Sequence, residues 1–317
     1  MWLTQIITYT FFLPLVMFSP LPINLGGYMW GDVTAYNRYT YLVPGQIVKW
    51  DIGWAQIEPF EGVYAFPPLV QTNCAYYNDH GYRQFINTQN VPTWARMYPL
   101  VSYSPPAPAY IDDWIRAVDA MIDYCHPEYL ELWNEPDVTL NSGAFWGTAF
   151  GDMPGYYAEV IAQAYITLKP LHPEVTFVVG ALTLGNEQDE VWIDTVLDMG
   201  LMGDALSFHS YNYNPTLSVD LLQHKHDFLA VRTDMPLWVS ETALLCKPEW
   251  VCDDTFRDNQ AAYFTNAYNY THDVRIGGLI HYSQNDVGWN NCNMVDEYDN
   301  IKYPVWYNFS QVLEGVR

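Results

Sequence analysis

The feature that most constrains the fold of this chain is a regular alternation between short apolar runs and amphipathic stretches of helical period. The clearest amphipathic stretch covers residues 111–125, where apolar side chains recur at spacings of three and four residues. Further helices are predicted over residues 154–169, 190–200, 218–231 and 258–272. An apolar, β-rich run follows each of them, and such continuous runs are typical of parallel strands that are covered on both faces.

The apolar runs predict eight strands along the chain. They are Ile23–Met29, Gln46–Asp51, Arg83–Asn87, Tyr129–Asn134, Thr176–Ala181, Ala205–Tyr211, Leu237–Glu241 and Gly278–Tyr282. Alternating strand and helix units in this number predict an α/β fold, the (β/α)8 TIM barrel, with its active site at the carboxyl ends of the strands. An open doubly wound sheet is the alternative, although neither a GxGxxG motif nor a phosphate-binding loop follows the first strand.

With 317 residues and no low-complexity tract or charge run to divide it, the chain is expected to form a single domain over residues 1–317. Residues 1–22 are apolar, but no Lys or Arg precedes the apolar run, no small-residue cleavage site follows it, and Pro14 interrupts it. We interpret this segment either as a degenerate signal peptide or as a segment at the bottom of the barrel.

The charge balance limits the possible partners. The 13 Lys and Arg residues against 36 Asp and Glu residues give a formal net charge of −23, which repels nucleic acid and anionic membranes. Aromatic residues make up 17% of the chain, and their flat rings suit stacking on sugars. We therefore expect a monomer that binds carbohydrate and neither nucleic acid nor membrane, in an extracellular location.

The cysteines show no metal-binding or redox spacing. The chain contains Cys74, Cys125, Cys246, Cys252 and Cys292, and no CxxC pair occurs among them. A bridge between Cys246 and Cys252, a bridge between Cys252 and Cys292, and buried free thiols are all compatible with the spacing. We expect no structural metal.

Polar residues cluster where the predicted strands end. Asn134 and Glu135 end the fourth strand, His209 and Tyr211 the sixth, and Glu241 the seventh. In a barrel these positions converge on one pocket. Two carboxylates that face each other can cleave a glycosidic bond, because one protonates the leaving oxygen while the other attacks or activates water. Tyr211 is a candidate hydrogen-bond donor to Glu241.

Three motifs at these strand ends resemble a known group of enzymes. WNEP at residues 133–136, SFHSY at 207–211 and WVSET at 238–242 look like the retaining glycoside hydrolases of the (β/α)8 clan that includes families 5, 39 and 42. VKWDIGWAQIEPFEGVYAF at residues 48–66 and VPTWA at 91–95 are similar to segments after the second and third strands, and family 39 is closest in motif.

The resemblance implies a role for each matching residue. Glu135 would be the general acid/base, Glu241 the nucleophile, and Asn134 the partner of a sugar 2-hydroxyl. Tyr211 would bond Glu241, and His209 would either support that network or touch substrate. The mechanism needs no metal and no organic cofactor, so none is expected.

The chain departs from the family in two places. Lys49 stands where the family usually has Arg, and the eighth strand lacks the Trp that commonly serves as a sugar platform, so Tyr282 or Trp289 would take that role. The accessory β-domain typical of family 39 is not recognised in the sequence.

Four other residues near these motifs have expected pairing or packing roles. Glu131 lies two pleats before Glu135, on the same side of the strand and deeper in the barrel, and a buried carboxylate there is expected to pair with Arg83 or Lys49. Trp54 and Trp94 are expected to pack at loop bases, whereas Asp51 is compatible with either a sugar hydroxyl or Lys49.

Together these features predict a secreted, retaining β-glycosidase that acts on a poly- or oligosaccharide, with an open groove that favours internal cleavage. An exo-acting enzyme similar to a β-xylosidase or β-glucosidase is one alternative. A carbohydrate-binding barrel without catalytic activity is another.

Overall fold

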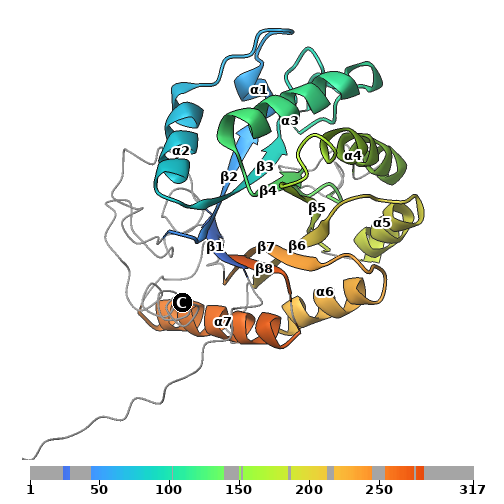
Figure 1. The fold of residues 1–317 in the computed structure, drawn as a ribbon. Helices are drawn as coiled ribbons and strands as arrows, with labels where there is room; N and C mark the ends of the chain where they lie inside the picture. Colours follow the sequence, from blue (N-terminus) through green and yellow to red (C-terminus); the bar gives the residue numbers. More distant parts are fainter. Residues whose placement is uncertain are drawn as a thin grey trace, which may run out of the picture.

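The protein folds as a closed parallel β-barrel surrounded by helices (Figure 1). The computed structural model describes residues 24–28, 44–101, 103–138, 150, 153–184, 187–212, 218–244, 254–274 and 276–281. Eight strands pair in sequence order, and the first pairs in parallel with the last, so the sheet has no open edge. The predicted (β/α)8 fold is confirmed, and the doubly wound alternative is wrong because its sheet would stay open.

All eight predicted strands are present. They are β1 (Asn24–Tyr28), β2 (Ile47–Gly53), β3 (Arg83–Gln89), β4 (Tyr129–Leu132), β5 (Thr176–Leu182), β6 (Ala205–Asn212), β7 (Leu237–Leu244) and β8 (Gly278–His281). The fourth strand is shorter than predicted because Trp133 has a φ of 84°, which a strand cannot contain. Strand β7 continues past Glu241, so this residue lies within the strand and not at its end.

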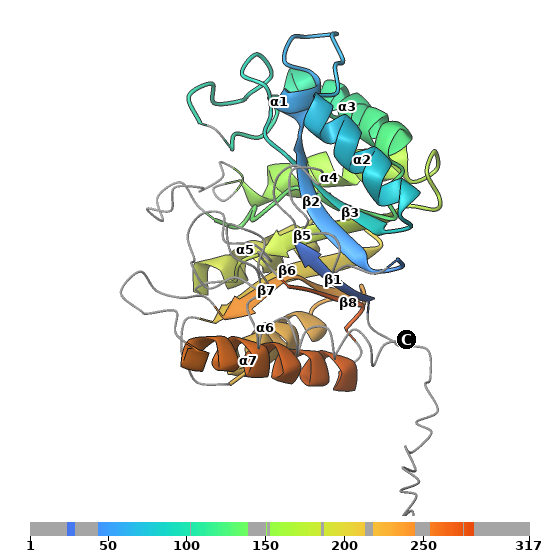
Figure 2. The ribbon, with the colours of Figure 1, turned by 90° about the vertical axis from the view of Figure 1, so that its left-hand side faces the viewer.

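Helices follow most of the strands and cover the outside of the barrel. They are α1 (Trp54–Ile57), α2 (Pro68–Asp79), α3 (Ile111–Cys125), α4 (Pro154–Leu168), α5 (Glu187–Asp198), α6 (Asp220–Ala230) and α7 (Asp254–Asp273), with a 3-10 turn η2 (Pro108–Tyr110) before α3. Both views place α2 and α3 on one side of the barrel and α6 and α7 on the opposite side (Figure 2). In the described ranges, no helix is both long and apolar enough to cross a membrane.

The interior of the barrel changes from apolar to charged along its axis. Side chains near the amino ends of the strands form an apolar cluster: Ile47, Phe85, Tyr129, Val178, Ala205, Trp238 and Ile280. Two residues further along, the same inward face of β2, β4 and β6 carries Lys49, Glu131 and Ser207, all fully buried. The barrel interior thus has two buried layers. The apolar layer lies toward the amino ends of the strands, and the polar layer lies above it, toward their carboxyl ends.

A disulfide joins the helices α2 and α3. Cys74 and Cys125 are bonded, with Cα atoms 4.9 Å apart and 51 positions apart in sequence. The sequence-based alternatives missed this bridge, because its cysteines come from neighbouring helices that only the tertiary fold brings together. Cys246, Cys252 and Cys292 lie outside the described residues, as does the apolar segment 1–22.

Trp54 and Trp94 pack at the loop bases as predicted. Trp54 begins α1 directly after β2 and is fully buried. Its ring meets that of Trp94 edge to face, with centroids 5.3 Å apart. The pair supports the loops that leave β2 and β3 toward the carboxyl end of the barrel.

Candidate active site

Two glutamates from opposite parts of the sequence meet at the carboxyl end of the barrel. Glu135 follows β4, and Glu241 projects from β7. A shift in the pairing of β6 with β7 places His209 beside Glu241. The imidazole of His209 spans both carboxylates, with Nδ1 2.9 Å from Glu135 Oε1 and Nε2 3.7 Å from Glu241 Oε1. The two glutamates therefore face one space.

Glu241 has the stronger set of partners. Its Oε1 accepts a hydrogen bond from Lys49 Nζ at 3.0 Å, and its Oε2 accepts one from the hydroxyl of Tyr211. Burial alone would raise the pKa of Glu241, but the charges of His209 and Lys49 and the bonds from Tyr211 and Lys49 outweigh it. The pKa of Glu241 is thus lowered, and the residue is held as a carboxylate at 5% exposure.

Lys49 supplies the positive charge beneath the site. Its ammonium is fully buried, 2.7 Å from Glu131 Oε2 as well as 3.0 Å from Glu241 Oε1. Burial disfavours the charged ammonium, but Glu131 and Glu241 more than compensate and raise the pKa of Lys49. The expected pairing of Glu131 is therefore with Lys49, and Ser207 Oγ donates to its second oxygen at 2.7 Å.

Arg83, the other expected partner of Glu131, lies near the amino end of the barrel instead. Its guanidinium pairs with Glu128 at 2.6 Å and also donates to the hydroxyl of Tyr129. Arg83 begins β3, whereas Glu131 faces the middle of the barrel. Lys49 alone of these two candidates thus reaches the carboxylates of the site.

The two glutamates that flank His209 affect the pKa of its imidazole. Burial would lower the pKa of this imidazole, but the charge of Glu241 and the hydrogen bond and charge of Glu135 raise it overall. Only the imidazolium has a proton on both ring nitrogens, so the charged form suits both carboxylates at once. His209 thereby contacts both carboxylates of the site.

The backbone around Glu135 is held in an unusual conformation. Glu135 has a φ of 46°, in the left-handed region that costs a non-glycine residue about 1–2 kcal/mol. Its N–H donates to Ala181 O at 3.2 Å. Asp137, which is almost fully buried, accepts bonds from the backbone N–H groups of Thr183 and Leu184 and from the Thr183 hydroxyl, each at 2.9–3.0 Å. The loop with Glu135 is thereby tied to the end of β5.

Polar residues of β2 and β3 extend the site sideways. The Oδ1 atom of Asn134 accepts a hydrogen bond from Asn87 Nδ2 at 3.1 Å. Gln89 Nε2 donates to Asp51 Oδ2 at 3.1 Å. The negative charge of Asp51 also helps to raise the pKa of Lys49, one of the two partners considered from sequence. These amide and carboxylate groups suit recognition of sugar hydroxyls.

Tyr103 is a residue of the site that sequence reasoning missed. Burial raises the pKa of its phenol, and the negative charges of Asp51 and Glu135 raise it further, so the ring stands near both. Tyr103 belongs to the irregular segment between β3 and α3, where no periodic pattern points to an inward direction. The two expected sugar platforms, Tyr282 and Trp289, lie outside the described residues.

The arrangement provides two carboxylates in unequal environments. Glu241 is surrounded by a lysine, a tyrosine and a histidine, whereas among the described residues the side chain that bonds Glu135 is His209. Such a pair can supply one ionised carboxylate and one proton donor to the same bond. Asn134 precedes Glu135 in the chain, so its amide lies beside this carboxylate.

No protein-family model matches the chain, and no curated protein sequence matches it either. Solved structures match along most of its length. A family 39 glycoside hydrolase from the gut symbiont Bacteroides cellulosilyticus WH2 has a TM-score of 0.66 and 17% identity, and the alignment covers 94% of this chain. This chain spans 64% of the length of that structure.

Two further structures show the same likeness. The GH10 structure from Paenibacillus barcinonensis has a TM-score of 0.65 and 14% identity, with 90% of this chain and 94% of the other covered. The exo-beta-1,4-mannosidase Op5Man5 from Opitutaceae bacterium strain TAV5 has a TM-score of 0.67 and 14% identity, with 93% and 60% covered. The chain therefore shares its (β/α)8 fold with glycoside hydrolases.

Proposed function

We propose that this protein is a retaining β-glycosidase that hydrolyses O-glycosidic bonds of a poly- or oligosaccharide by double displacement. The observation that carries the proposal is the unequal pair of glutamates, Glu135 directly after β4 and Glu241 within β7. One carboxylate is held ionised, and the second shares an imidazole with it. The fold, which the chain shares with glycoside hydrolases, supports the same reaction class.

In the first step, the carboxylate of Glu241 attacks the anomeric carbon and forms a glycosyl ester. Glu135 donates its proton to the glycosidic oxygen as the bond to carbon breaks, so the leaving group departs as a neutral alcohol. The negative charge moves from Glu241 to Glu135. His209 touches both groups, so its positive charge stabilises the pair before and after this transfer.

In the second step, Glu135 accepts a proton from water while the water oxygen attacks the anomeric carbon. The ester bond breaks, the sugar leaves with its original anomeric configuration, and Glu241 is again a carboxylate. Lys49 and Tyr211 bond both oxygens of Glu241 and therefore favour its release as a good leaving group. No external oxidant, reductant or metal takes part in this sequence.

The substrate is proposed to lie across the carboxyl end of the barrel. Asn134 is aligned by Asn87 and would contact the 2-hydroxyl of the sugar attached to Glu241. Internal cleavage is the favoured mode, and removal of terminal sugars is the alternative. The structures with the same fold include an endo-1,4-beta-xylanase from Penicillium canescens and the exo-acting mannosidase named above.

An extracellular location is part of the proposal. The disulfide between Cys74 and Cys125 supports it, because such bonds persist in oxidising compartments. A net charge of −23 and an aromatic content of 17% are compatible with a protein that works on neutral polysaccharides.

The test is a panel of aryl β-glycosides and soluble glucans, xylans and mannans, assayed with the wild type, Glu135→Gln and Glu241→Gln. We expect turnover by the wild type and loss of turnover in both variants, with the first-formed anomer identified by NMR as the retained one. The size of the first products from a polymer separates internal from terminal cleavage. Binding without turnover in the wild type would establish a catalytically inactive barrel instead.

A further inference from the structure

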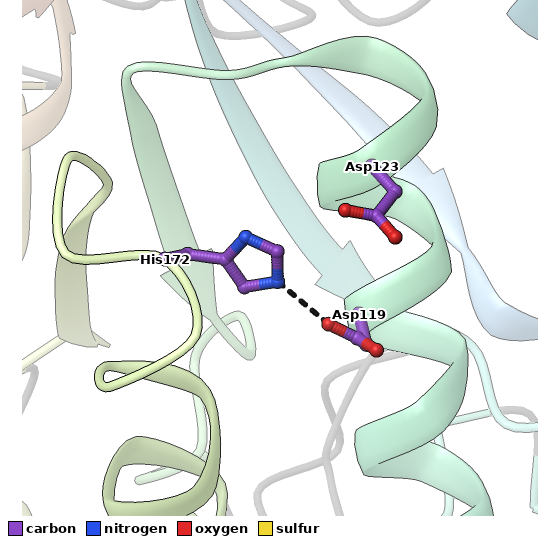
Figure 3. A group of neighbouring side chains, drawn as sticks. All are labelled: Asp119, Asp123 and His172. Atoms are coloured by element: carbon purple, nitrogen blue, oxygen red, sulfur yellow. Dashed lines mark hydrogen bonds and ion pairs between the residues drawn. The ribbon is translucent and has the colours of Figure 1, made fainter.

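A second group of ligand-type side chains lies on the outside of the barrel, away from the glutamate pair (Figure 3). It comprises Asp119 and Asp123 from α3 and His172 from the loop between α4 and β5. One oxygen or nitrogen atom of each lies within 4.8 Å of the others. Because this loop leads into the amino end of β5, the group stands at the end of the barrel opposite Glu135 and Glu241.

The helix α3 presents its two carboxylates to the same neighbour. Asp119 and Asp123 are one turn apart, at positions i and i+4, and their side chains lie on the side of α3 that faces His172 (Figure 3). Like charges at this spacing disfavour a helix when no cation lies between them. In the described part of the chain, neither aspartate forms an ion pair with a Lys or Arg side chain.

The histidine is buried between two carboxylates. His172 is only 8% exposed, and its Nε2 lies 2.6 Å from Asp119 Oδ1. Its other ring nitrogen, Nδ1, faces Glu174 Oε1 at 3.9 Å. Metal-bound histidines commonly have one nitrogen toward the ion and a carboxylate behind the other, which orients the ring and makes it a better donor.

The geometry points to a structural site for a divalent transition-metal ion, with His172, Asp119 and Asp123 as ligands. One imidazole nitrogen and two carboxylate oxygens form a donor set that suits Zn²⁺ and that a strictly oxygen-preferring ion such as Ca²⁺ does not favour. A carboxylate oxygen binds Zn²⁺ at about 2.0–2.2 Å, so the three donors must close up around the ion. Asp123 is exposed and can turn to do so.

The bound ion would join the end of α3 to the loop before β5. The same helix is already tied to α2 by Cys125, two residues after Asp123. A metal site here would therefore fix the carboxyl end of α3 on both sides. A hydrogen bond between His172 and Asp119 without an ion is the competing explanation, and it assigns no part to Asp123.

The test uses the full-length protein, freed of metal by a chelator and then dialysed, and titrated with Zn²⁺ in a calorimeter and in a thermal melt without added thiol. We expect one tight Zn²⁺ in the wild type and a rise of several degrees in Tm, because a ligand that binds only the folded state stabilises it. Asp123→Asn and His172→Gln should lose that binding event and that rise. Ca²⁺ should raise Tm less than Zn²⁺.

Asp198→Asn is the matched control, because Asp198 is also an exposed aspartate in the last turn of a helix, α5. This variant should bind Zn²⁺ as the wild type does. Zn²⁺ bound elsewhere persists in every variant and cancels in the comparison. The proposal is overturned if the wild type gains no stability from Zn²⁺, or if Asp123→Asn binds it as tightly as the wild type does.

Discussion

The ammonium of Lys49 donates to Glu241 at 3.0 Å while it pairs with Glu131 at 2.7 Å, so one buried cation serves a structural and a proposed catalytic carboxylate together. Through Lys49, the charge of Glu241 is therefore coupled to the charge of Glu131 in the interior of the barrel. In the proposed reaction, Lys49 is a positioning residue that acts on substrate through Glu241.

Replacement of Lys49 by Met should affect both stability and the pH profile. Breaking a buried ion pair from one side costs about 3–5 kcal/mol, because it leaves buried charges without a partner. The pKa of Glu241, no longer lowered by Lys49, should rise, and the acidic limb of kcat/KM should move to higher pH. Urea unfolding and a pH series of initial rates measure the two effects.

Arg83→Met is the matched control for Lys49→Met, because it removes a cation from the neighbouring strand without touching Glu241. Its acidic limb should coincide with that of the wild type. If Lys49→Met left the acidic limb in place as well, the proposed link between Lys49 and Glu241 would be wrong.

Tyr211→Phe removes one hydroxyl that bonds Glu241. A hydrogen bond to a charged group contributes about 1.5–3 kcal/mol, and if the transition state loses that amount, kcat should fall about 10- to 100-fold. Steady-state kinetics measure the change. Tyr165→Phe removes a comparable bond, from a tyrosine to Asp204 at 2.9 Å outside the site, and should leave kcat unchanged. Equal losses in the two variants would contradict a specific role for Tyr211.

Because the pKa of His209 is raised, its contribution to the free energy of unfolding should depend on pH. The folded state holds the imidazole proton more tightly than the unfolded state, so the stabilisation is fully present below the unfolded pKa of about 6.5 and is lost as the pH rises through the folded pKa. The loss of unfolding free energy in His209→Gln should therefore be greater at about pH 6 than at about pH 9. Denaturant titrations at the two pH values measure it, and a larger loss at the higher pH would contradict the assignment.

The bridge between Cys74 and Cys125 should stabilise the fold through its loop. Closing 51 positions of chain lowers the entropy of the unfolded state and contributes about 4 kcal/mol in the loop-closure account. A variant with Cys74→Ser and Cys125→Ser should therefore have a lower Tm than the oxidised wild type. A reductant should lower the Tm of the wild type toward that of the double variant, and an unchanged Tm on removal of both cysteines would contradict a stabilising bridge.

The barrel could be predicted from sequence because each strand is an apolar run followed by a turn or helix signal, and parallel strands bury both faces. The site at the carboxyl ends followed from that frame, since Glu135 comes after β4 while Tyr211 and Glu241 lie in the carboxyl-terminal halves of β6 and β7. The choice of Lys49 over Arg83 for Glu131 depended on depth along the barrel axis, which sequence spacing alone left open.

Other contacts had no signal in the sequence. Cys74 meets Cys125 because α2 packs beside α3, and Tyr103 approaches Glu135 from an irregular segment without period. His172, in the loop between α4 and β5, reaches Asp119 on α3 for the same reason. These three contacts depend on how helices and irregular segments pack, which neither periodicity nor spacing indicates.

The central claim is tested most directly by trapping the proposed covalent intermediate. A 2-deoxy-2-fluoro glycoside with a good leaving group, built on the sugar that the substrate panel identifies, slows release of the enzyme-bound sugar. We predict one sugar per protein by intact mass spectrometry, attached to the peptide that contains Glu241, and no labelling of Glu241→Gln. A substrate that is turned over while no adduct forms, or an adduct on another residue, would contradict the assignment of Glu241 as the nucleophile.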